Sequence, residues 1–352
     1  MQHSALAYLP TAFFAVAPEL AALDLPQEVR ATCSNCAVGA PKGQTTSKRP
    51  FDVDLRCCTY HPNHVNWLVG RGLRRGGVSE VRIRARMQDM DGVTVVGIAP
   101  PTGWREQYSK EAGNLFGRAE HLRCPYLLPS QDGCAVWRDR GAVCRTWHCR
   151  HVDGPRGQEL WLYTRRVLHS VERRLAAWCV LDAGPPDESD WDKADVMIDW
   201  FVHCADVVDG LRPEAAVKMR DKMLRNRIRD MQAAGEAHLP PVPDYLGPRI
   251  GEVVRDEATG EVTLRGTSAL DHEDFPHAIF QLLSRLDGKT RWQDAVEAAN
   301  AVVPDAPFDA ALIERLFRKG MLSERDPDEL APTPGVSEGP RVALPYDRED
   351  LL

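Results

Sequence analysis

Several signatures that would assign an enzyme class are missing from this sequence. It has no phosphate loop, no G-x-G-x-x-G opening a helix after a strand, no H-E-x-x-H zinc motif and no C-x3-C-x2-C of radical chemistry. The spacing of such motifs places phosphates, dinucleotides or catalytic metals. No independent nucleotide, flavin or S-adenosylmethionine site is therefore predicted, and any chemistry has to be sought elsewhere in the chain.

The chain also lacks a net positive charge, and its apolar N-terminus forms no uninterrupted apolar run. The net charge is -7, so the chain lacks the basic footprint of a nucleic-acid-binding protein. The apolar residues 1–23 carry no basic n-region and are interrupted by Pro10 and Pro18, which suits neither a membrane span nor a secretory signal. We expect a cytoplasmic protein with no membrane or nucleic-acid partner, in which disulfides are the less favoured state of the cysteines.

Cysteine is abundant by contrast. Eight of the ten cysteines lie between Cys33 and Cys149, and the last four of these follow the spacing C-x9-C-x9-C-x4-C. Thiolates are strong ligands for zinc and for iron–sulfur clusters. The spacing matches neither a ferredoxin nor a zinc finger, so it predicts a metal without naming it.

The earlier four cysteines form two pairs. Cys33 and Cys36 make a C-x2-C turn that lets two thiolates reach one ion, whereas Cys57 and Cys58 are adjacent. Neighbouring side chains of an extended chain point to opposite faces, so one of that pair is expected to ligate while the other faces a second centre or the core. Eight thiols allow two four-ligand centres, or one centre with spare thiols. The predicted metal ligands are Cys33, Cys36, Cys57, Cys58, Cys124, Cys134, Cys144 and Cys149.

Arginine and histidine residues accompany these cysteines. Four arginines adjoin a cysteine: Arg56, Arg123, Arg145 and Arg150. If their side chains face the thiols, they would lower the thiol pKa values. The alternative is that these arginines are merely solvated. Two histidine pairs have a spacing that suits zinc or iron, although eight thiols favour supporting or surface roles for them: His61 with His64, and His148 with His151.

The stretch CPYLLPSQDGCAVWRDRGAVCRTWHC resembles the second half of the CxxCxxCC (YkgJ-type) family of zinc- or iron-chelating domains. That family has a cysteine before a short apolar run, a second cysteine before an aromatic residue and an Arg-containing turn, and a closing C-R-x-x-x-C. The matching positions are Cys124, Cys134 with Trp137 and Arg140, and Cys144-Arg145 through Cys149, with Gly141 in place of the usual proline. The first half, C-x-x-C-x-x-C-C, matches only in pieces, because 20 residues separate Cys36 from Cys57. The resemblance implies zinc or iron binding and, in relatives similar to flagellin lysine methylases, an iron–sulfur cluster.

The segment from His277 to Glu324 resembles winged-helix-like domains related to the PqqD peptide chaperone. The shared features are an apolar helix ending in L-D-G, a second helix begun by a threonine, and a third helix that ends in a basic residue, Gly and Met-Leu. The resemblance implies a module that can bind a peptide or protein partner.

The periodicity of the remaining chain predicts a mainly helical α+β fold with small β-hairpins. We expect helices at 19–31, from Val65, at 158–179, from an Asp190 cap, from Pro213 to about 234, and at 275–286, 291–302 and 308–319. Hairpins are expected from 78–87 with 93–99, and around Gly260. The predicted domains are a cysteine-cluster metal-binding domain (1–155), a helical region (156–238) and a winged-helix domain (248–326), followed by a disordered tail (327–352).

Together these features predict a metal-binding cysteine-cluster protein with an iron–sulfur or iron/zinc centre. Redox chemistry, metal handling, or modification of a recruited protein or peptide are the expected roles, and whether the chain is an enzyme stays open. The alternative is a non-enzymatic interaction or scaffold protein with structural zinc.

Overall fold

A computed structural model describes residues 6–28, 36, 39–41, 43–45, 50–128, 133–149, 151–255, 260–266, 272–304 and 307–325. The expected mainly helical α+β class is confirmed. In chain order the helices are α1 (Thr11–Val16), α2 (Glu19–Ala22), α3 (Asn66–Arg75), α4 (Gly77–Met87), α5 (Trp104–Leu115), α6 (Ala142–Arg145), α7 (Gly154–Ala183), α8 (Ala194–Asp209), α9 (Pro213–Lys218), α10 (Lys222–Ala237), α11 (Ile279–Leu283), α12 (Trp292–Asn300) and α13 (Ala310–Arg318). Short 3-10 helices occupy Glu120–Leu122, Trp137–Asp139 and Glu188–Asp190.

The strands are short and form small separate sheets. They are β1 (Gly39–Ala40), β2 (Phe51–Asp52), β3 (His64–Val65), β4 (Val93–Thr94), β5 (Gly97–Ile98), β6 (Leu127–Leu128), β7 (Gly133–Cys134), β8 (Leu246–Pro248), β9 (Glu252–Arg255), β10 (Val262–Arg265), β11 (His272–Phe275) and β12 (Leu322–Glu324). β1 pairs in parallel with β2, and the other sheets, with strand orders β3-β5-β4, β6-β7, β12-β8 and β11-β10-β9, are antiparallel.

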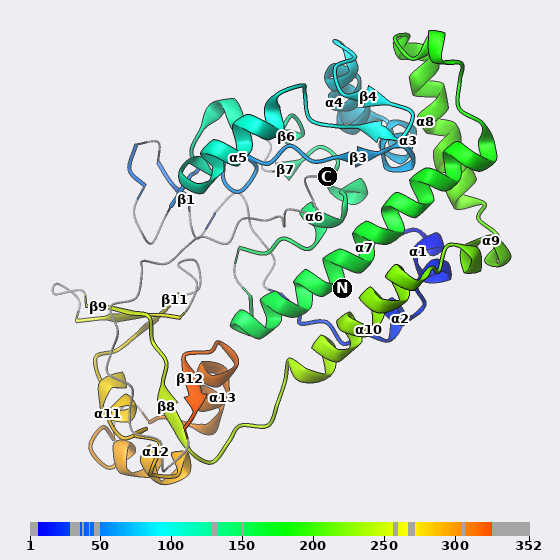
Figure 1. Cartoon of the computed structure of the whole chain (residues 1–352). Helices are drawn as coiled ribbons and strands as arrows, with labels where there is room; N and C mark the ends of the chain where they lie inside the picture. The colour runs from blue at the N-terminus through cyan, green and yellow to red at the C-terminus, as the bar shows by residue number, and fades with distance from the viewer. Residues whose placement is uncertain are drawn as a thin grey trace.

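The long helix α7 organises the first two thirds of the chain (Figure 1). Its proline near the first turn suits a helix start, and Leu160, Val167, Val171 and Leu175 lie on one buried face. Helices α1, α3, α8 and α10 pack around it and share its hydrophobic core. The expected helix at 158–179 is confirmed and extends further at both ends.

The segment 78–87 is a helix, so the predicted strand there is wrong. Alternation placed Val81 on the buried face, yet this side chain is 64% exposed. The buried residues of α4 are Ser79, Ile83 and Met87, which repeat every four residues as one face of a helix does. An ion pair between Arg84 and Glu80 spans one turn and adds support. The strands β4 and β5 still form a hairpin, which pairs with β3 instead.

Three helix predictions also need correction at their ends. The helix expected at 19–31 is limited to Glu19–Ala22 within the described residues. Asp190 does not cap α8, because a 3-10 turn intervenes and Lys193 occupies the cap position. The helix expected from Pro213 to about 234 is two helices, since the Asp221 side chain accepts a hydrogen bond from the Leu224 backbone N–H and begins α10.

The C-terminal module comprises the sheets of β8–β12 and the helices α11–α13, which enclose a second hydrophobic core. The hairpin expected around Gly260 is present as β9 and β10. Of the predicted core residues, Val296 and Leu312 are only partly buried, while five are buried: Leu282, Leu283, Leu286, Leu316 and Leu322. The predicted disordered tail from 327 lies outside the described residues, and the domain boundaries stay predictions. No helix in the described part of the chain is long and apolar enough to cross a membrane.

Candidate functional site

The cysteines of two distant chain segments meet beside α6. The backbone N–H of Cys124 donates to the carbonyl of Cys58 at 2.9 Å, which joins the segments directly. The β6–β7 ladder places Cys134 opposite Leu127, and α6 carries Cys144. None of the nine cysteines that the structure describes is in a disulfide. We call seven of them the thiol cluster: Cys36, Cys57, Cys58, Cys124, Cys134, Cys144 and Cys149.

The thiol cluster spans two apolar surroundings. Cys58, Cys124 and Cys134 belong to the main core around α3, α7 and α8. The other four pack against an aromatic group around α5 that includes Phe51, Tyr60, Trp104, Tyr108 and Phe116: Cys36, Cys57, Cys144 and Cys149. Cys57 and Cys58 thus pack in different apolar groups, but their thiols are hydrogen-bonded to each other, so the two side chains do not simply point to opposite faces as in an extended chain. Each surrounding contains cysteines from both chain segments.

The Cys57 thiol is ionised more readily than an ordinary cysteine. Hydrogen bonds from the Cys149 and Cys58 thiols lower the pKa of Cys57 well below its usual value. The same hydrogen bond to Cys57, together with burial, raises the pKa of Cys58. One thiolate that accepts hydrogen bonds from two neutral thiols is a nucleophile and a first anchor for a metal ion.

The deeper thiols are held neutral. Burial raises the pKa of Cys124 well above its usual value, and burial raises that of Cys144 to about 12. The neighbouring Cys134 adds to both shifts because two negative charges would repel each other. These thiols can become ligands only when an arriving metal displaces their protons.

The arginine that acts most clearly on the thiols is Arg140. Burial lowers its pKa, while the Cys134 and Cys144 thiolates favour its charged form. Its guanidinium lies 3.5 Å over the ring of the half-exposed Trp137, and Nη1 donates to the Cys144 carbonyl at 2.9 Å. A cation held there offsets negative charge on a thiolate-rich group.

The arginines next to cysteines have other partners. The Nε of Arg56 donates to the Val53 carbonyl, and Arg123 pairs with Glu120. Arg145 is buried and donates to the carbonyls of Arg138 and Arg140. Arg150 lies outside the described residues, as does the predicted ligand Cys33.

The loop that carries these groups is tied to α3 by Asp139. Arg75 donates through Nε and Nη2 to the two carboxylate oxygens of Asp139, each at 2.9 Å, and the carboxylate is buried. His64 Nε2 donates to the Asp139 backbone carbonyl at 3.0 Å. A bidentate, charge-assisted contact of this kind fixes orientation as well as position.

The four candidate histidines are neutral. Burial lowers the pKa of His61, His64 and His151 to about 4 and that of His148 to about 3. His64 also shares a 3.4 Å hydrogen bond with the Tyr126 hydroxyl, which makes it a structural residue. His148 packs on Trp161 with ring centroids 4.6 Å apart.

A metal ion needs several ligands around one point. Among the described residues, no three His, Cys, Asp or Glu side chains form a group that could hold a metal ion in this arrangement. The described thiols therefore do not converge on one point. The indole N–H of Trp147, two residues before Cys149, is buried and contributes to the lowered pKa of Cys57.

A water-sized cavity of about 10 Å³ adjoins the thiol cluster. It lies beside Cys144 and is lined by the buried Glu172 together with His169 and Asn63. Glu172 could not be singled out in the sequence, because a single acidic residue on a helix resembles any solvated one. Trp147 was missed for the related reason that spacing does not reveal where a side chain points.

No family model matches the chain, and neither a curated protein nor a solved structure resembles it significantly.

Proposed function

We propose that the thiol cluster binds an iron–sulfur cluster or an iron/zinc centre in a cytoplasmic protein, where thiols stay reduced. The observation that carries the proposal is the packing of Cys57 and Cys149 against the same aromatic group, which brings together thiols that are 92 residues apart in the chain. The proposed ligands are Cys57, Cys58, Cys124, Cys134, Cys144 and Cys149, joined by Cys36 and Cys33.

The arrangement favours a polynuclear centre over a single zinc ion. A structural zinc needs four ligands at about 2.3 Å from one point. The thiol cluster offers more sulfur atoms than one zinc can bind, and they are divided between two apolar surroundings. A cluster of several metal atoms spreads its thiolate ligands over a wider volume, and Arg140 supplies a nearby positive charge that offsets the charge of such a group.

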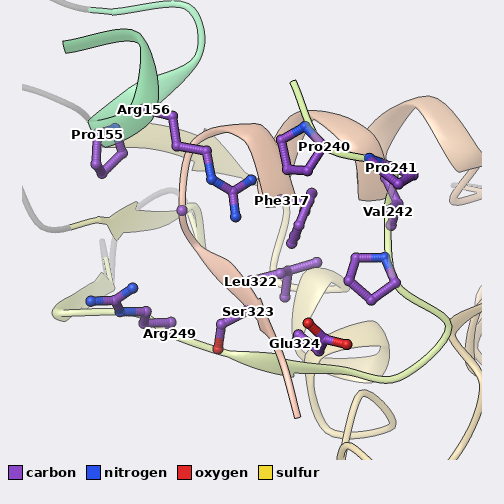
Figure 2. A pocket seen from close by; sticks show the side chains of 12 residues that line it. Pro155, Arg156, Pro240, Pro241, Val242, Arg249, Phe317, Leu322, Ser323 and Glu324 are labelled. Carbon is purple, nitrogen blue, oxygen red and sulfur yellow. The ribbon is translucent and has the colours of Figure 1, made fainter. Parts of the chain in front are cut away.

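A cleft at the C-terminal module supports recruitment of a peptide partner. Its volume is about 440 Å³, and it lies between the start of α7 and the strand β12 (Figure 2). Arg156 reaches across it and stacks on Phe317 at 4.6 Å. The lining combines apolar and polar surface, and includes Pro240, Pro241, Val242, Pro243, Leu322, Arg249 and Glu324.

The strand β12 offers backbone groups to this cleft. The Met321 carbonyl accepts from Arg249, and the Arg325 N–H donates to Tyr245, so these two residues bond toward β8. Antiparallel strands alternate such bonds, which leaves the N–H and C=O groups of Leu322 and Glu324 on the outer edge. An extended apolar peptide could add to that edge as a further strand.

These features suit a protein that brings a redox or metal centre to a recruited peptide. Redox chemistry, metal handling and peptide modification are all compatible with such an arrangement. A scaffold protein with structural zinc is the competing proposal, because a structural zinc can contribute about 10–16 kcal/mol of apparent binding free energy without any reaction.

Anaerobic purification separates the two proposals. The cluster proposal predicts coloured protein with a broad visible absorption band and with iron and acid-labile sulfide in the assay. Colourless protein that contains zinc alone would support the scaffold. Protein that takes up neither iron nor zinc after reconstitution would refute both.

The peptide proposal can be tested at the edge of β12. Extended apolar peptides selected by display against the full chain should bind the wild type and lose binding to Glu324→Pro, which removes an outward N–H and leaves the bonds to β8 in place. The control Ser323→Ala should bind normally. Equal binding to all three proteins would contradict addition at this edge.

A further inference from the structure

The side chain of Arg156 projects from the first turn of α7 into the cleft at the C-terminal module (Figure 2). Its guanidinium lies 4.6 Å from the centre of the Phe317 ring, and a cation over an aromatic face is held there by the charge distribution of the ring. Phe317 is buried in the core of the module, so it is a firm support. The positive charge is therefore positioned in the cleft before any ligand arrives.

This guanidinium has unused hydrogen-bonding capacity. Its Nη1 atom is buried and has no hydrogen-bond partner in the described part of the chain. No ion pair joins Arg156 to a described acidic residue. Because a guanidinium can only donate, a buried N–H of this kind is unfavourable until an acceptor reaches it.

The position of Arg156 in α7 does not benefit the helix. The first turn contains no acidic residue, and the cap residue Asp153 makes no side-chain hydrogen bond to the helix backbone. The Asp153 carboxylate instead lies 3.8 Å from His238 Nε2. A cation near the N-terminus of a helix is disfavoured and an anion is favoured there, so helix stability does not explain an arginine at this place.

The rest of the lining indicates what kind of anion fits. The charged residues of the lining are Arg156, Arg249 and Glu324, which leaves one positive charge in excess. Figure 2 shows Glu324 at the other end of the lining from Arg156. Between the charged groups lie apolar side chains, including Val242 and Leu322. A small inorganic anion would gain nothing from that apolar surface, whereas an acidic residue flanked by apolar ones in a peptide would use both.

We propose that Arg156 determines the specificity of the cleft: its guanidinium binds the carboxylate of an aspartate or glutamate in an extended apolar peptide that lies along the edge of β12. This inference rests on the proposed recruitment of a peptide, and it names the chemical class of that peptide. A carboxylate accepts two parallel hydrogen bonds from a guanidinium, so Nη1 gains the acceptor that it lacks.

Peptide display against the full chain tests this inference. Peptides selected on the wild type should be enriched in aspartate and glutamate over asparagine and glutamine. Each selected peptide is then synthesised in its acidic form and in an amide form, in which the acidic residue is replaced by its amide. Fluorescence anisotropy should give a Kd about tenfold lower for the acidic form, because a charge-assisted pair is lost in the amide.

Variants of the protein assign this preference to one side chain. Arg156→Gln should bind both forms with the weaker affinity of the amide form. Arg156→Lys keeps the charge without the paired N–H groups and should recover part of the preference. Arg285→Gln is the matched control, because Arg285 lies in the same module, donates to the Gln281 carbonyl at 2.6 Å and does not line the cleft. It should keep the tenfold preference.

The outcomes separate this inference from the proposed recruitment. If no peptide binds the wild type, the recruitment is refuted and the inference falls with it. If peptides bind the wild type and fail to bind Glu324→Pro, yet the two forms bind equally, the recruitment holds and the role of Arg156 is overturned. A preference that persists in Arg156→Gln overturns it as well. If Arg156→Gln binds neither form, recovery of the acidic form in Arg156→Lys supports the inference, and no recovery overturns it.

Discussion

The adjacent residues Cys57 and Cys58 have pKa values shifted in opposite directions. Cys57 accepts hydrogen bonds from the Cys149 and Cys58 thiols, which lower its pKa, while the pKa of Cys58 is raised. A metal bound as proposed would meet the Cys57 thiolate first and displace the Cys58 proton later.

Removal of one deep thiol should abolish metal retention. Cys144→Ser is expected to lose most of the bound metal, because a hydroxyl is a poor ligand for soft metals and Cys144 contacts the aromatic surrounding. Cys204→Ala is the control, since Cys204 is buried beside Cys179, away from the thiol cluster. Metal content per chain after anaerobic desalting measures both. Equal loss in the two variants would contradict a specific site.

The burial of His64 predicts a pH dependence of stability. The unfolded chain takes up this proton near pH 6.5 and the folded chain only near pH 4, because burial disfavours the charged ring. Between these pH values the unfolded state binds more protons, so the free energy of unfolding falls as the pH drops. At pH 4 the contribution of His64 alone should lower the free energy of unfolding by about 3 kcal/mol.

Urea unfolding of metal-free protein from pH 7 to pH 4 measures this loss. His64→Gln should remove only the His64 share of the dependence, because His61, His148 and His151 have pKa values lowered in the same direction. His203→Gln, at an exposed position on α8, should keep the wild-type slope. A slope in His64→Gln equal to that of the wild type would show that burial of His64 does not contribute.

At the level of single residues, the sequence predicted which cysteines lie close together, but not which apolar residues surround them. Cysteine type and order indicate metal chemistry, and seven of the eight candidates lie in the thiol cluster, while Cys33 lies outside the described residues. The position of Trp147 among these thiols could not be predicted, because spacing does not reveal where a side chain points.

Among the elements, α3 and α8 show how a close approach depends on glycine. A Cβ added at Gly70 would lie 1.8 Å from the Phe201 backbone oxygen, so only glycine permits this helix crossing. Gly113 in α5 has no described atom within 4 Å of an added Cβ. Two glycines inside helices thus have opposite environments.

Replacing each by alanine should change stability in opposite directions. Gly70→Ala is expected to destabilise by about 1–3 kcal/mol, because the two backbones must separate. Gly113→Ala should stabilise by about 0.5–1 kcal/mol through helix propensity. Denaturant unfolding measures both, and a stable Gly70→Ala protein would mean that the crossing is looser than described.

The elements also show where periodicity misleads. In α4 a run of alternating apolar and arginine residues satisfied a strand pattern, while the spacing of Ser79, Ile83 and Met87 satisfied a helix. Burial against α3 decided between them, and that contact is not visible locally. In α9 and α10 a single helical pattern concealed a break at Asp221, whose capping role depends on side-chain direction.

At the scale of the whole molecule, the thiol cluster and the C-terminal module are joined by the first turn of α7. Gly154 lies only five residues after Cys149. A Cβ added at Gly154 would lie 2.6 Å from the Cα of Lys319 in the C-terminal module. Arg156, two residues further along, lines the cleft. The first turn of α7 therefore connects the cleft to the segment that carries Cys149.

Gly154→Ala should loosen the docking of the C-terminal module. The added methyl group would collide with the backbone near Lys319, and limited proteolysis of the segment 238–245 should become faster. Gly184→Ala is the matched control, since Gly184 also has a positive φ angle but has no described atom near an added Cβ. Equal cleavage rates would show that backbone strain, and not the contact, explains the effect.

Native mass spectrometry of the full chain after anaerobic purification shows whether the thiol cluster binds a metal centre. It reports the mass of any bound group and the number of groups per chain. If the proposed function is correct, each chain carries one added mass that matches an iron–sulfur or iron/zinc centre, absent from Cys144→Ser and retained in Cys204→Ala. A wild-type chain that has its bare mass after reconstitution with iron, sulfide and zinc would refute it.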